Sequence, residues 1–324
     1  WLAIDGEPWN KVQQREYMKR ETAKISKSGR STLEFFTSLS ATGKSKELEK
    51  QMLNDVFVLD DIAILGQWTA IFASPGSGKT LITLYLLADA ISKARIDGSN
   101  VFYVNVDDSF KGGVEKTRFA EQHGFHMLLP GVNGFEKNTV LEILEGLITE
   151  DSARGQVVVM DTLKKFVDTM DKKSSSKFGD LARQFVASGG TMICLSHTNK
   201  NKGADGRSTY GGTSDIVDDA DCAFTIEMVE EHSISSLSST FQVEFNNIKN
   251  RGDVALTAGF SWLRSKGLGY DSLLASVERL GQGAIEEVKH QAEIQAQQKK
   301  DSYIIKSVVS LLMAVPSSGK TDIV

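Results

Sequence analysis

The chain has 324 residues, a formal net charge of −5 and 24% charged side chains. These values are ordinary for a folded globular protein, and they exclude the collagen-like, disordered and disulfide-scaffold classes. No apolar run approaches the roughly 18 residues that a membrane-spanning helix needs, so we expect no membrane association. Because the net charge is negative, any nucleic acid would have to be bound by local basic loops.

The cysteines and the chain ends bear on the compartment in which the protein works. Cys194 and Cys222 each lie inside an apolar stretch, and we expect both to be reduced core residues of an intracellular protein. The chain begins at Trp1 without a signal-peptide pattern. We therefore expect a cytoplasmic protein. Since the first residue is not Met and the chain stops abruptly at Val324, we also expect a fragment of a longer protein.

Residues 1–50 are polar and charged. They predict an N-terminal arm or linker, with a helix over Lys11 to Lys27. A solvated arm is the favoured interpretation. The alternative is a linker that docks on a neighbouring subunit.

From Gln67 onward, short apolar runs alternate with stretches of helical spacing. The expected buried strands are Gln67–Ala73, Asn100–Val106, Gln156–Met160 and Thr191–Ser196. The expected helices are Lys79–Lys93, Gly113–His123, Thr139–Thr149 and Phe178–Ala187. This alternation predicts an α/β fold with a mostly parallel central sheet and helices on both faces.

Three later apolar runs lie closer together and predict antiparallel strands added at one edge of the sheet. They are Asp221–Glu227, Thr240–Asn246 and Ala255–Trp262. After residue 282 the composition changes to Gln, Glu and Lys. A helical connector is expected over 283–300, and an amphipathic helix over Asp301–Val315.

Residues Ala73 to Thr80 match the phosphate-loop (P-loop) pattern, with Ala at the position usually given as Gly. Gly76 and Gly78 let backbone N–H groups surround a phosphate at the start of a helix. Lys79 would reach the β- and γ-phosphates of ATP, and the Thr80 hydroxyl would bind Mg²⁺. The predicted nucleotide-binding residues are Ser74, Pro75, Gly76, Ser77, Gly78, Lys79, Thr80 and Leu81.

A second match to the same pattern spans residues 314–321, but a helix precedes it. We interpret it as the turn of a helix-turn-helix instead of a nucleotide site.

Acidic or imidazole side chains follow three of the expected strands. Asp161 ends the run Val157–Met160 in the manner of a Walker B strand and would hold Mg²⁺ opposite Thr80. Asp107 and Asp108 end another strand, where a carboxylate could activate the attacking water as a general base; the alternative is an acidic strand end or a helix cap. His197 ends the fourth strand, where it could contact the γ-phosphate; the alternative is a structural histidine.

Two polar loops, over 169–177 and 199–212, carry lysine, arginine and flexible Gly and Ser residues. They suit contact with a phosphate backbone, and Tyr210 could stack on a base. The alternative is a pair of solvated loops. The candidate DNA contacts are Lys172, Lys173, Lys200, Lys202, Arg207 and Tyr210.

Lys249 and Arg251 are two residues apart at the end of a strand and therefore point the same way. They could reach the γ-phosphate of a neighbouring subunit as an arginine finger. A basic hairpin turn explains the same residues, and the residues alone leave the two readings open.

The order of P-loop, Asp107, Asp161, His197, mobile loop and Lys-x-Arg-Gly resembles the RecA-like hexameric helicase ATPases. Within them it is similar to the plasmid RepA-type replicative helicases and to ATPase modules of phage and plasmid primase-helicases. The resemblance covers roughly residues 50–270 and implies a RecA-like core over 51–282. It matches Asp107 to the water-polarising carboxylate, which is usually Glu, so this chain has a shorter side chain at that position.

The resemblance also implies partners and further roles. It matches His197 and the loop 199–212 to the DNA-contacting centre of a ring, and Lys249 and Arg251 to the basic pair acting in trans, with Arg207 as a second candidate. ATP between subunits implies a homo-oligomer, most often a hexamer, working on single-stranded DNA in replication. Residues 301–324 resemble the start of a truncated winged-helix domain, and residues 1–50 could be the tail of a primase-like module.

The resulting expectation is an Mg²⁺- and ATP-dependent DNA helicase or translocase from a bacterial, phage or plasmid context, with a primase or replication-initiation partner. One alternative is a RecA-type recombinase or loader that uses ATP for assembly. The other is a nucleotide-switched DNA-binding regulator.

Overall fold

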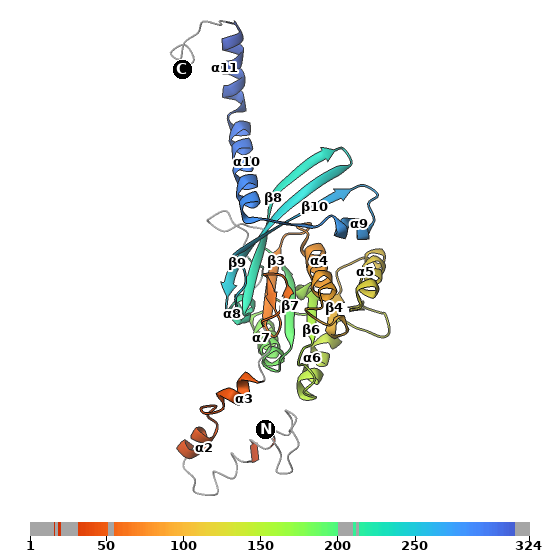
Figure 1. The fold of residues 1–324 in the computed structure, drawn as a ribbon, viewed down its shortest axis with the longest axis vertical. Coiled ribbons are helices and arrows are strands. Elements are labelled where there is room, and N and C mark those ends of the chain that lie inside the picture. Colours follow the sequence, from red (N-terminus) through yellow and green to blue (C-terminus); the bar gives the residue numbers. More distant parts are fainter. Residues whose placement is uncertain are drawn as a thin grey trace.

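The computed structural model describes residues 16, 19–20, 32–50, 55–199, 210–211 and 214–314. Two short helices, α2 (Thr32–Ser38) and α3 (Ser45–Glu49), precede the main body and lie apart from it in Figure 1. The described side chains of both helices are exposed.

A nine-stranded sheet forms the body, in the order β11-β10-β9-β8-β3-β7-β6-β4-β5. The six strands from β8 to β5 run parallel, and β9, β10 and β11 continue the sheet in antiparallel pairs. The strands are β3 (Trp68–Ala73), β4 (Val101–Asn105), β5 (His126–Leu128), β6 (Val157–Asp161), β7 (Thr191–His197), β8 (Cys222–Ser235), β9 (Ser238–Asn250), β10 (Thr257–Ser265) and β11 (Glu278–Leu280). A separate small sheet pairs β1 (Phe57–Leu59) with β2 (Ala63–Ile64).

Helices cover both faces of the parallel strands (Figure 1). On one face lie α4 (Lys79–Ser92), α5 (Phe110–His123) and α9 (Tyr270–Ala275). On the other lie α6 (Thr139–Thr149), α7 (Lys172–Ala187) and α8 (Asp215–Asp219).

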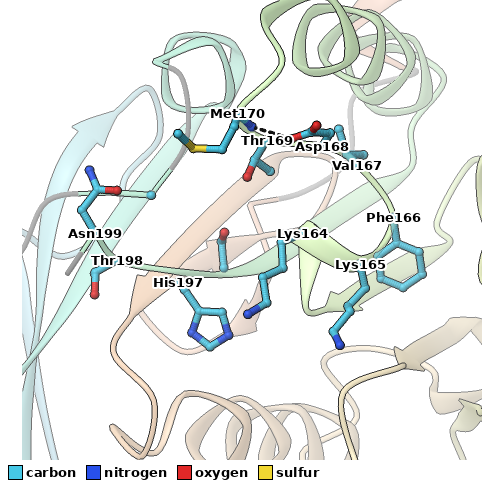
Figure 2. Close-up of a pocket in the computed structure, with 12 residues that line it drawn as sticks. Lys164, Lys165, Phe166, Val167, Asp168, Thr169, Met170, His197, Thr198 and Asn199 are labelled. Carbon is cyan, nitrogen blue, oxygen red and sulfur yellow. Dashed lines mark hydrogen bonds between the residues drawn. The ribbon is translucent and has the colours of Figure 1, made fainter.

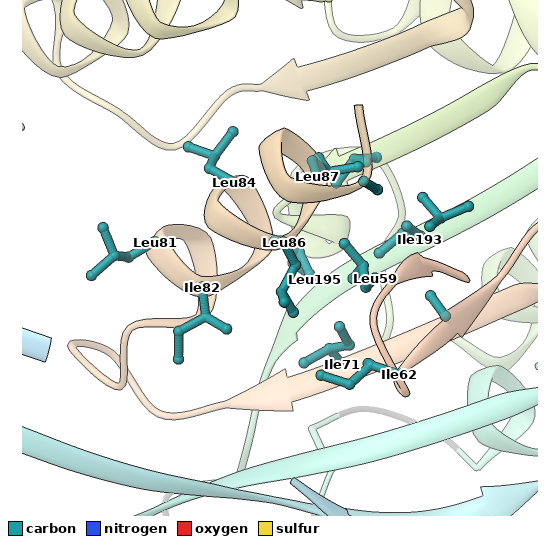
Figure 3. Packing of buried hydrophobic residues seen from close by; sticks show 14 of the residues in the cluster. Leu59, Ile62, Ile71, Leu81, Ile82, Leu84, Leu86, Leu87, Ile193 and Leu195 are labelled. Carbon is teal, nitrogen blue, oxygen red and sulfur yellow. The ribbon is translucent and has the colours of Figure 1, made fainter. Parts of the chain in front are cut away.

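The strands divide their side chains between two cores because successive residues of a strand point to opposite faces. In β3, Ile71 and Ala73 face α4, whereas Ala70 and Phe72 join the core under α6 and α7. Figure 3 shows the α4 side of this arrangement, with leucines of the helix packed over isoleucines of the strands. Strands buried on both faces explain the near-continuous apolar runs in the sequence.

The predicted α/β fold and its four core strands are confirmed. Two expectations are wrong in part. The run beginning near Asp221 forms β8, which is parallel to β3 and not antiparallel. The predicted loop 169–177 becomes helical at Lys172, because the side chain of Asp171 accepts a hydrogen bond from the backbone N–H of Ser174 at 2.8 Å and caps the helix.

Two helices follow the sheet, α10 (Gln282–Lys300) and α11 (Ser302–Ala314), close to the ranges expected. Ile285 is buried near Gly259 of β10, and Lys289 pairs with Glu244 of β9 at 2.6 Å, so the first half of α10 is held on the sheet. Beyond it, α11 extends away from the body (Figure 1). The second P-loop-like match and the rest of the expected winged-helix start lie outside the described residues, and the domain boundaries stay a prediction.

Cys194 and Cys222 are buried free thiols, as expected. None of the helices over the described residues is long and apolar enough to cross a membrane.

Candidate nucleotide site

The carboxyl ends of four parallel strands bring the predicted site residues to one edge of the sheet. In register, Ala73 of β3 lies beside His197 of β7, and Asn105 of β4 lies beside Asp161 of β6. Ligand sites gather at this edge in open α/β sheets. The segments that leave these strands therefore surround one position.

The P-loop connects β3 to α4. Gly76 and Gly78 have φ values of 81° and 75°, a left-handed conformation that glycine adopts without strain. The Ser77 hydroxyl donates to the carbonyl of Ser74 at 2.7 Å and closes the turn. A cavity of about 420 Å³ borders this loop. It is lined by residues 74 and 76–81 of the loop and helix, and by Lys116, Trp262, Arg264, Tyr270 and Leu273.

Asp161 lies at the centre of the site and is only 3% exposed. Its Oδ2 accepts hydrogen bonds from the Thr80 hydroxyl at 2.7 Å and from the Tyr103 hydroxyl at 2.8 Å. Its Oδ1 lies 3.7 Å from Lys79 Nζ. Burial and the neighbouring Asp161 charge raise the pKa of Tyr103 well above its ordinary value, so Tyr103 stays a neutral donor.

These groups fit Mg²⁺ and a nucleotide phosphate. The hydroxyl of Thr80 and the carboxylate of Asp161 are oxygen ligands, which Mg²⁺ prefers, and it commonly takes one or two protein ligands beside phosphates. Within the described part of the chain, no cluster of three or more His, Cys, Asp or Glu side chains forms a self-contained metal site. The two predicted Mg²⁺ ligands, Thr80 and Asp161, thus lie within hydrogen-bonding distance of each other. Their role in binding the metal stays a prediction.

Asp107 lies just beyond β4 and faces a lysine and a histidine. Its Oδ1 is 3.2 Å from Lys165 Nζ, and its Oδ2 is 3.9 Å from His197 Nε2. Partial burial raises the pKa of Asp107, but the hydrogen bond and charge of Lys165, with Lys164 and His197, outweigh it and leave the pKa below its ordinary value. Asp107 is therefore an ionised carboxylate beside the nucleotide site.

Asp108 is engaged differently from its neighbour in the sequence. Its Oδ2 forms an ion pair with Lys116 of α5 and accepts a hydrogen bond from Asn105 Nδ2 at 2.5 Å. Lys116 is 7% exposed and lies over the Tyr270 ring. The geometry thus favours Asp107 over Asp108 as the water-orienting group, and the base assignment stays a prediction.

His197 joins the nucleotide site to the segment that follows β7. Burial and the charges of Lys79 and Lys164 lower the pKa of His197, so its ring is neutral at pH 7. Its buried Nδ1 makes no hydrogen bond to the residues that the structure describes. The next residue, Thr198, lies 3.0 Å from Ser74 through their hydroxyls.

The candidate DNA contacts separate into three groups. Lys172 and Lys173 lie in the first turn of α7 and are exposed. Tyr210 forms an isolated β-bridge with Thr198, and the centroid of its ring lies 5.8 Å from that of Phe72, so the ring packs against the core. Lys200, Lys202 and Arg207 lie outside the described residues. Their roles at DNA stay predictions.

Lys249 and Arg251 lie at the opposite edge of the sheet from the P-loop of the same chain. Asn250 pairs with Cys222 at the start of β8, whereas Ala73 pairs with Ile226 farther along that strand. Lys249 Nζ donates to the carbonyl of Val217 at 2.8 Å and to that of Asp218, at the end of α8. Arg251 is exposed and has no ion pair within the described ranges.

Several residues near the site were not predicted from the sequence, among them Arg264 and Leu273 of the P-loop cavity. Lys116, Trp262 and Tyr270 line the P-loop cavity, and Lys165 holds Asp107. Trp262 and Tyr270 come from segments that sequence spacing does not connect to the P-loop. The repeated lysines after Asp161 were the only available signal for Lys165.

Residues 53–203 match a family model described as an AAA domain. This segment contains the P-loop, Asp107, Asp161 and His197. A search of curated proteins found no match to the chain. Together, the matched segment and the mostly parallel sheet support an ATPase with a RecA-like P-loop core.

Proposed function

We propose that the protein is a Mg²⁺- and ATP-dependent DNA translocase or helicase of the RecA-like ring type, acting on single-stranded DNA in replication. The observation that carries the proposal is the position of His197. It lies between Asp107, whose carboxylate is 3.9 Å away, and Thr198, where the loop rich in basic residues begins. Loss of the γ-phosphate on hydrolysis could therefore move the loop through a single side chain, that of His197.

Each residue of the site has a separate task in this proposal. The P-loop amides and Lys79 would hold the phosphates, and Thr80 with Asp161 would hold Mg²⁺, a cation that would supply charge neutralisation at the phosphate oxygens. Asp107 accepts a hydrogen bond from the attacking water and orients it. Tyr103 and Lys79 keep the Asp161 carboxylate in place.

The trans-acting part of the proposal rests on Arg251. Because Arg251 lies at the edge of the sheet opposite its own P-loop, it is better placed to serve a neighbouring subunit. A guanidinium from the next subunit would stabilise the charge that develops on the transferred phosphoryl group. A closed ring gives every site such a neighbour. A primase or replication-initiation partner and a cytoplasmic location complete the proposal.

The test is steady-state ATP hydrolysis with and without single-stranded DNA at several protein concentrations, with Lys79→Ala as the inactive control. We expect DNA to stimulate turnover and the rate per subunit to rise with concentration. Turnover that ignores both DNA and concentration would remove the ring translocase. Strand displacement on a forked duplex then separates a helicase from a translocase that does not unwind.

One observation favours a second candidate, a recombinase or loader that uses ATP for assembly. Asp107 has a shorter side chain than the glutamate usual in the resembled family, and its carboxylate is paired with Lys165. Both features favour slow hydrolysis. ATP-dependent assembly on DNA without strand displacement would support this candidate.

A further inference from the structure

A second cavity lies beside the nucleotide site, between the segments that follow β6 and β7. Its volume is about 460 Å³. Its ionisable lining groups are Lys164, Lys165, Asp168 and His197. Figure 2 shows the side chains of both lysines and the His197 ring pointing toward the same side.

The lysines that line this cavity are not fully neutralised by carboxylates. Asp168 accepts a hydrogen bond from the backbone N–H of Met170 at 3.0 Å, within its own loop. Lys164 is exposed and forms no ion pair with any residue in the described ranges, and His197 is neutral at pH 7. Lys165 has Asp107 as its partner, and both side chains of that pair are partly exposed, at 41% and 38%.

We propose that this cavity binds a phosphate group, and that the bound phosphate takes Lys165 from Asp107 and thereby frees the carboxylate to orient water. The inference rests on the proposed function, since it names how a bound strand would regulate the same site. In the absence of the phosphate, the ion pair locks Asp107. The 3₁₀ turn Leu163–Lys165 that carries both lysines starts two residues after Asp161, so the lock is built on the strand end that holds the metal ligand.

The ion pair weakens Asp107 as a base, because an ion-paired carboxylate is a weaker proton acceptor than a free one. Lys165, Lys164 and His197 are the charged and titratable groups that lower the pKa of Asp107, and Lys165 acts at the shortest distance. A phosphate offers Lys165 stronger, multiply charged acceptor oxygens. Losing the lysine would raise the basicity of Asp107.

The variant that removes the lock is Lys165→Gln, and Lys165→Arg is the conservative variant that keeps a cation. Lys137→Gln is the control, because Lys137 is an exposed lysine in the loop before α6. We expect Lys165→Gln to raise the DNA-free ATPase rate roughly two- to fivefold, which is the factor that corresponds to the energy of a partly exposed ion pair. The same variant should be stimulated less by single-stranded DNA. Lys137→Gln should keep the wild-type rate, and Lys165→Arg, which retains a cation opposite Asp107, should raise the rate less than Lys165→Gln does.

The pH profile supplies a readout that a merely structural lysine would not move. Activity requires ionised Asp107 and is lost as pH falls through its pKa. Because Lys165 lowers that pKa, its removal should shift the acidic limb of the rate profile to higher pH. A DNA-free rate that stays the same or falls in Lys165→Gln, with an unmoved acidic limb, would overturn the lock.

The source of the phosphate is tested on the wild type with single-stranded oligodeoxythymidylate and with inorganic phosphate. Stimulation by the oligonucleotide alone assigns the cavity to a strand phosphodiester, and equal stimulation by both assigns it to a free phosphate. Stimulation by neither overturns the phosphate site. The proposed function fails separately, if the wild type neither binds nor responds to the oligonucleotide while Lys165→Gln still raises the DNA-free rate.

Discussion

The two edges of the parallel strands place their charged side chains differently. At the carboxyl edge, three carboxylates pair with lysines beside the P-loop cavity or the cavity between β6 and β7: Asp161 with Lys79, Asp107 with Lys165, and Asp108 with Lys116. At the amino edge, the charged side chains connect secondary-structure elements and so stabilise the fold. Asp221 accepts hydrogen bonds from Arg183 of α7 and from the backbone N–H of Trp68 at 3.0 Å.

Some of these charged side chains hold segments of the chain together, and others face outward. Lys249 is one of the stabilising side chains, because its ammonium group donates hydrogen bonds to carbonyls of α8. Arg251, two residues later, has a backbone hydrogen bond to Asp221 but an exposed side chain. The charged groups at the carboxyl edge are thus paired within one chain, whereas the side chain of Arg251 at the amino edge is exposed.

The largest expected effect comes from Arg251→Ala. Loss of an arginine finger costs about 10³-fold in turnover, and stability should not change because the side chain is exposed. Mixing Arg251→Ala subunits with Lys79→Ala subunits, each inactive alone, should restore part of the ATPase rate, because some interfaces then combine an intact P-loop with an intact Arg251. Absence of recovery would contradict a shared site.

Asp107→Asn and Asp108→Asn should separate catalysis from stability at the carboxyl edge. Asp107→Asn should lower kcat about 10²-fold, as for loss of a general base, with an unchanged Tm. Asp108→Asn leaves Lys116 nearly buried without its carboxylate and should cost about 2 kcal/mol of unfolding free energy. Urea unfolding and phosphate release, measured on both variants, test the contrast, and equal effects on kcat would remove the distinction.

Lys249→Met should destabilise the fold by about 1 kcal/mol, because two α8 carbonyls lose a charged donor. Thermal unfolding beside Arg251→Ala measures it. If Lys249→Met instead abolished ATPase activity without lowering Tm, Lys249 would belong with Arg251 in the trans-acting pair.

The smallest expected effect concerns His197 and pH. Burial lowers the pKa of His197 below the ordinary value of 6.5, so below pH 6.5 the unfolded chain takes up the proton first. Wild-type stability should therefore fall as pH decreases from 7.5 toward 5.5. His197→Gln should show a shallower fall in Tm, and parallel curves for the two proteins would contradict the assignment.

The sequence predicted most of the parallel sheet because its strands are apolar on both faces and end in recognisable groups such as Asp161 and His197. The prediction was wrong where a helix N-cap starts a helix in a segment whose composition is typical of a loop. The serines after Lys173 are typical of a loop, yet Asp171 starts a helix there. The length of β8 and β9 was also underestimated, since their outer halves alternate polar residues as an exposed hairpin does.

The candidate site was predicted unevenly for a similar reason. Residues within the P-loop or at a strand end belong to short sequence patterns, and those patterns predict their position in the site. Lys116 on α5 and Tyr270 on α9 reach the same cavity only through the packing of α4, α5 and α9, which no short pattern encodes. Lys165 was hidden among surface lysines because its partner lies 58 residues earlier.

The indole ring of Trp262 provides an optical consequence of the P-loop geometry. A Cβ placed on Gly78 would lie 2.7 Å from that ring, and the ring stacks on Phe241 at 5.3 Å. The other described tryptophan, Trp68, is fully buried at the amino edge. Intrinsic fluorescence therefore carries a label-free signal from within the nucleotide cavity, and Trp262→Phe identifies it.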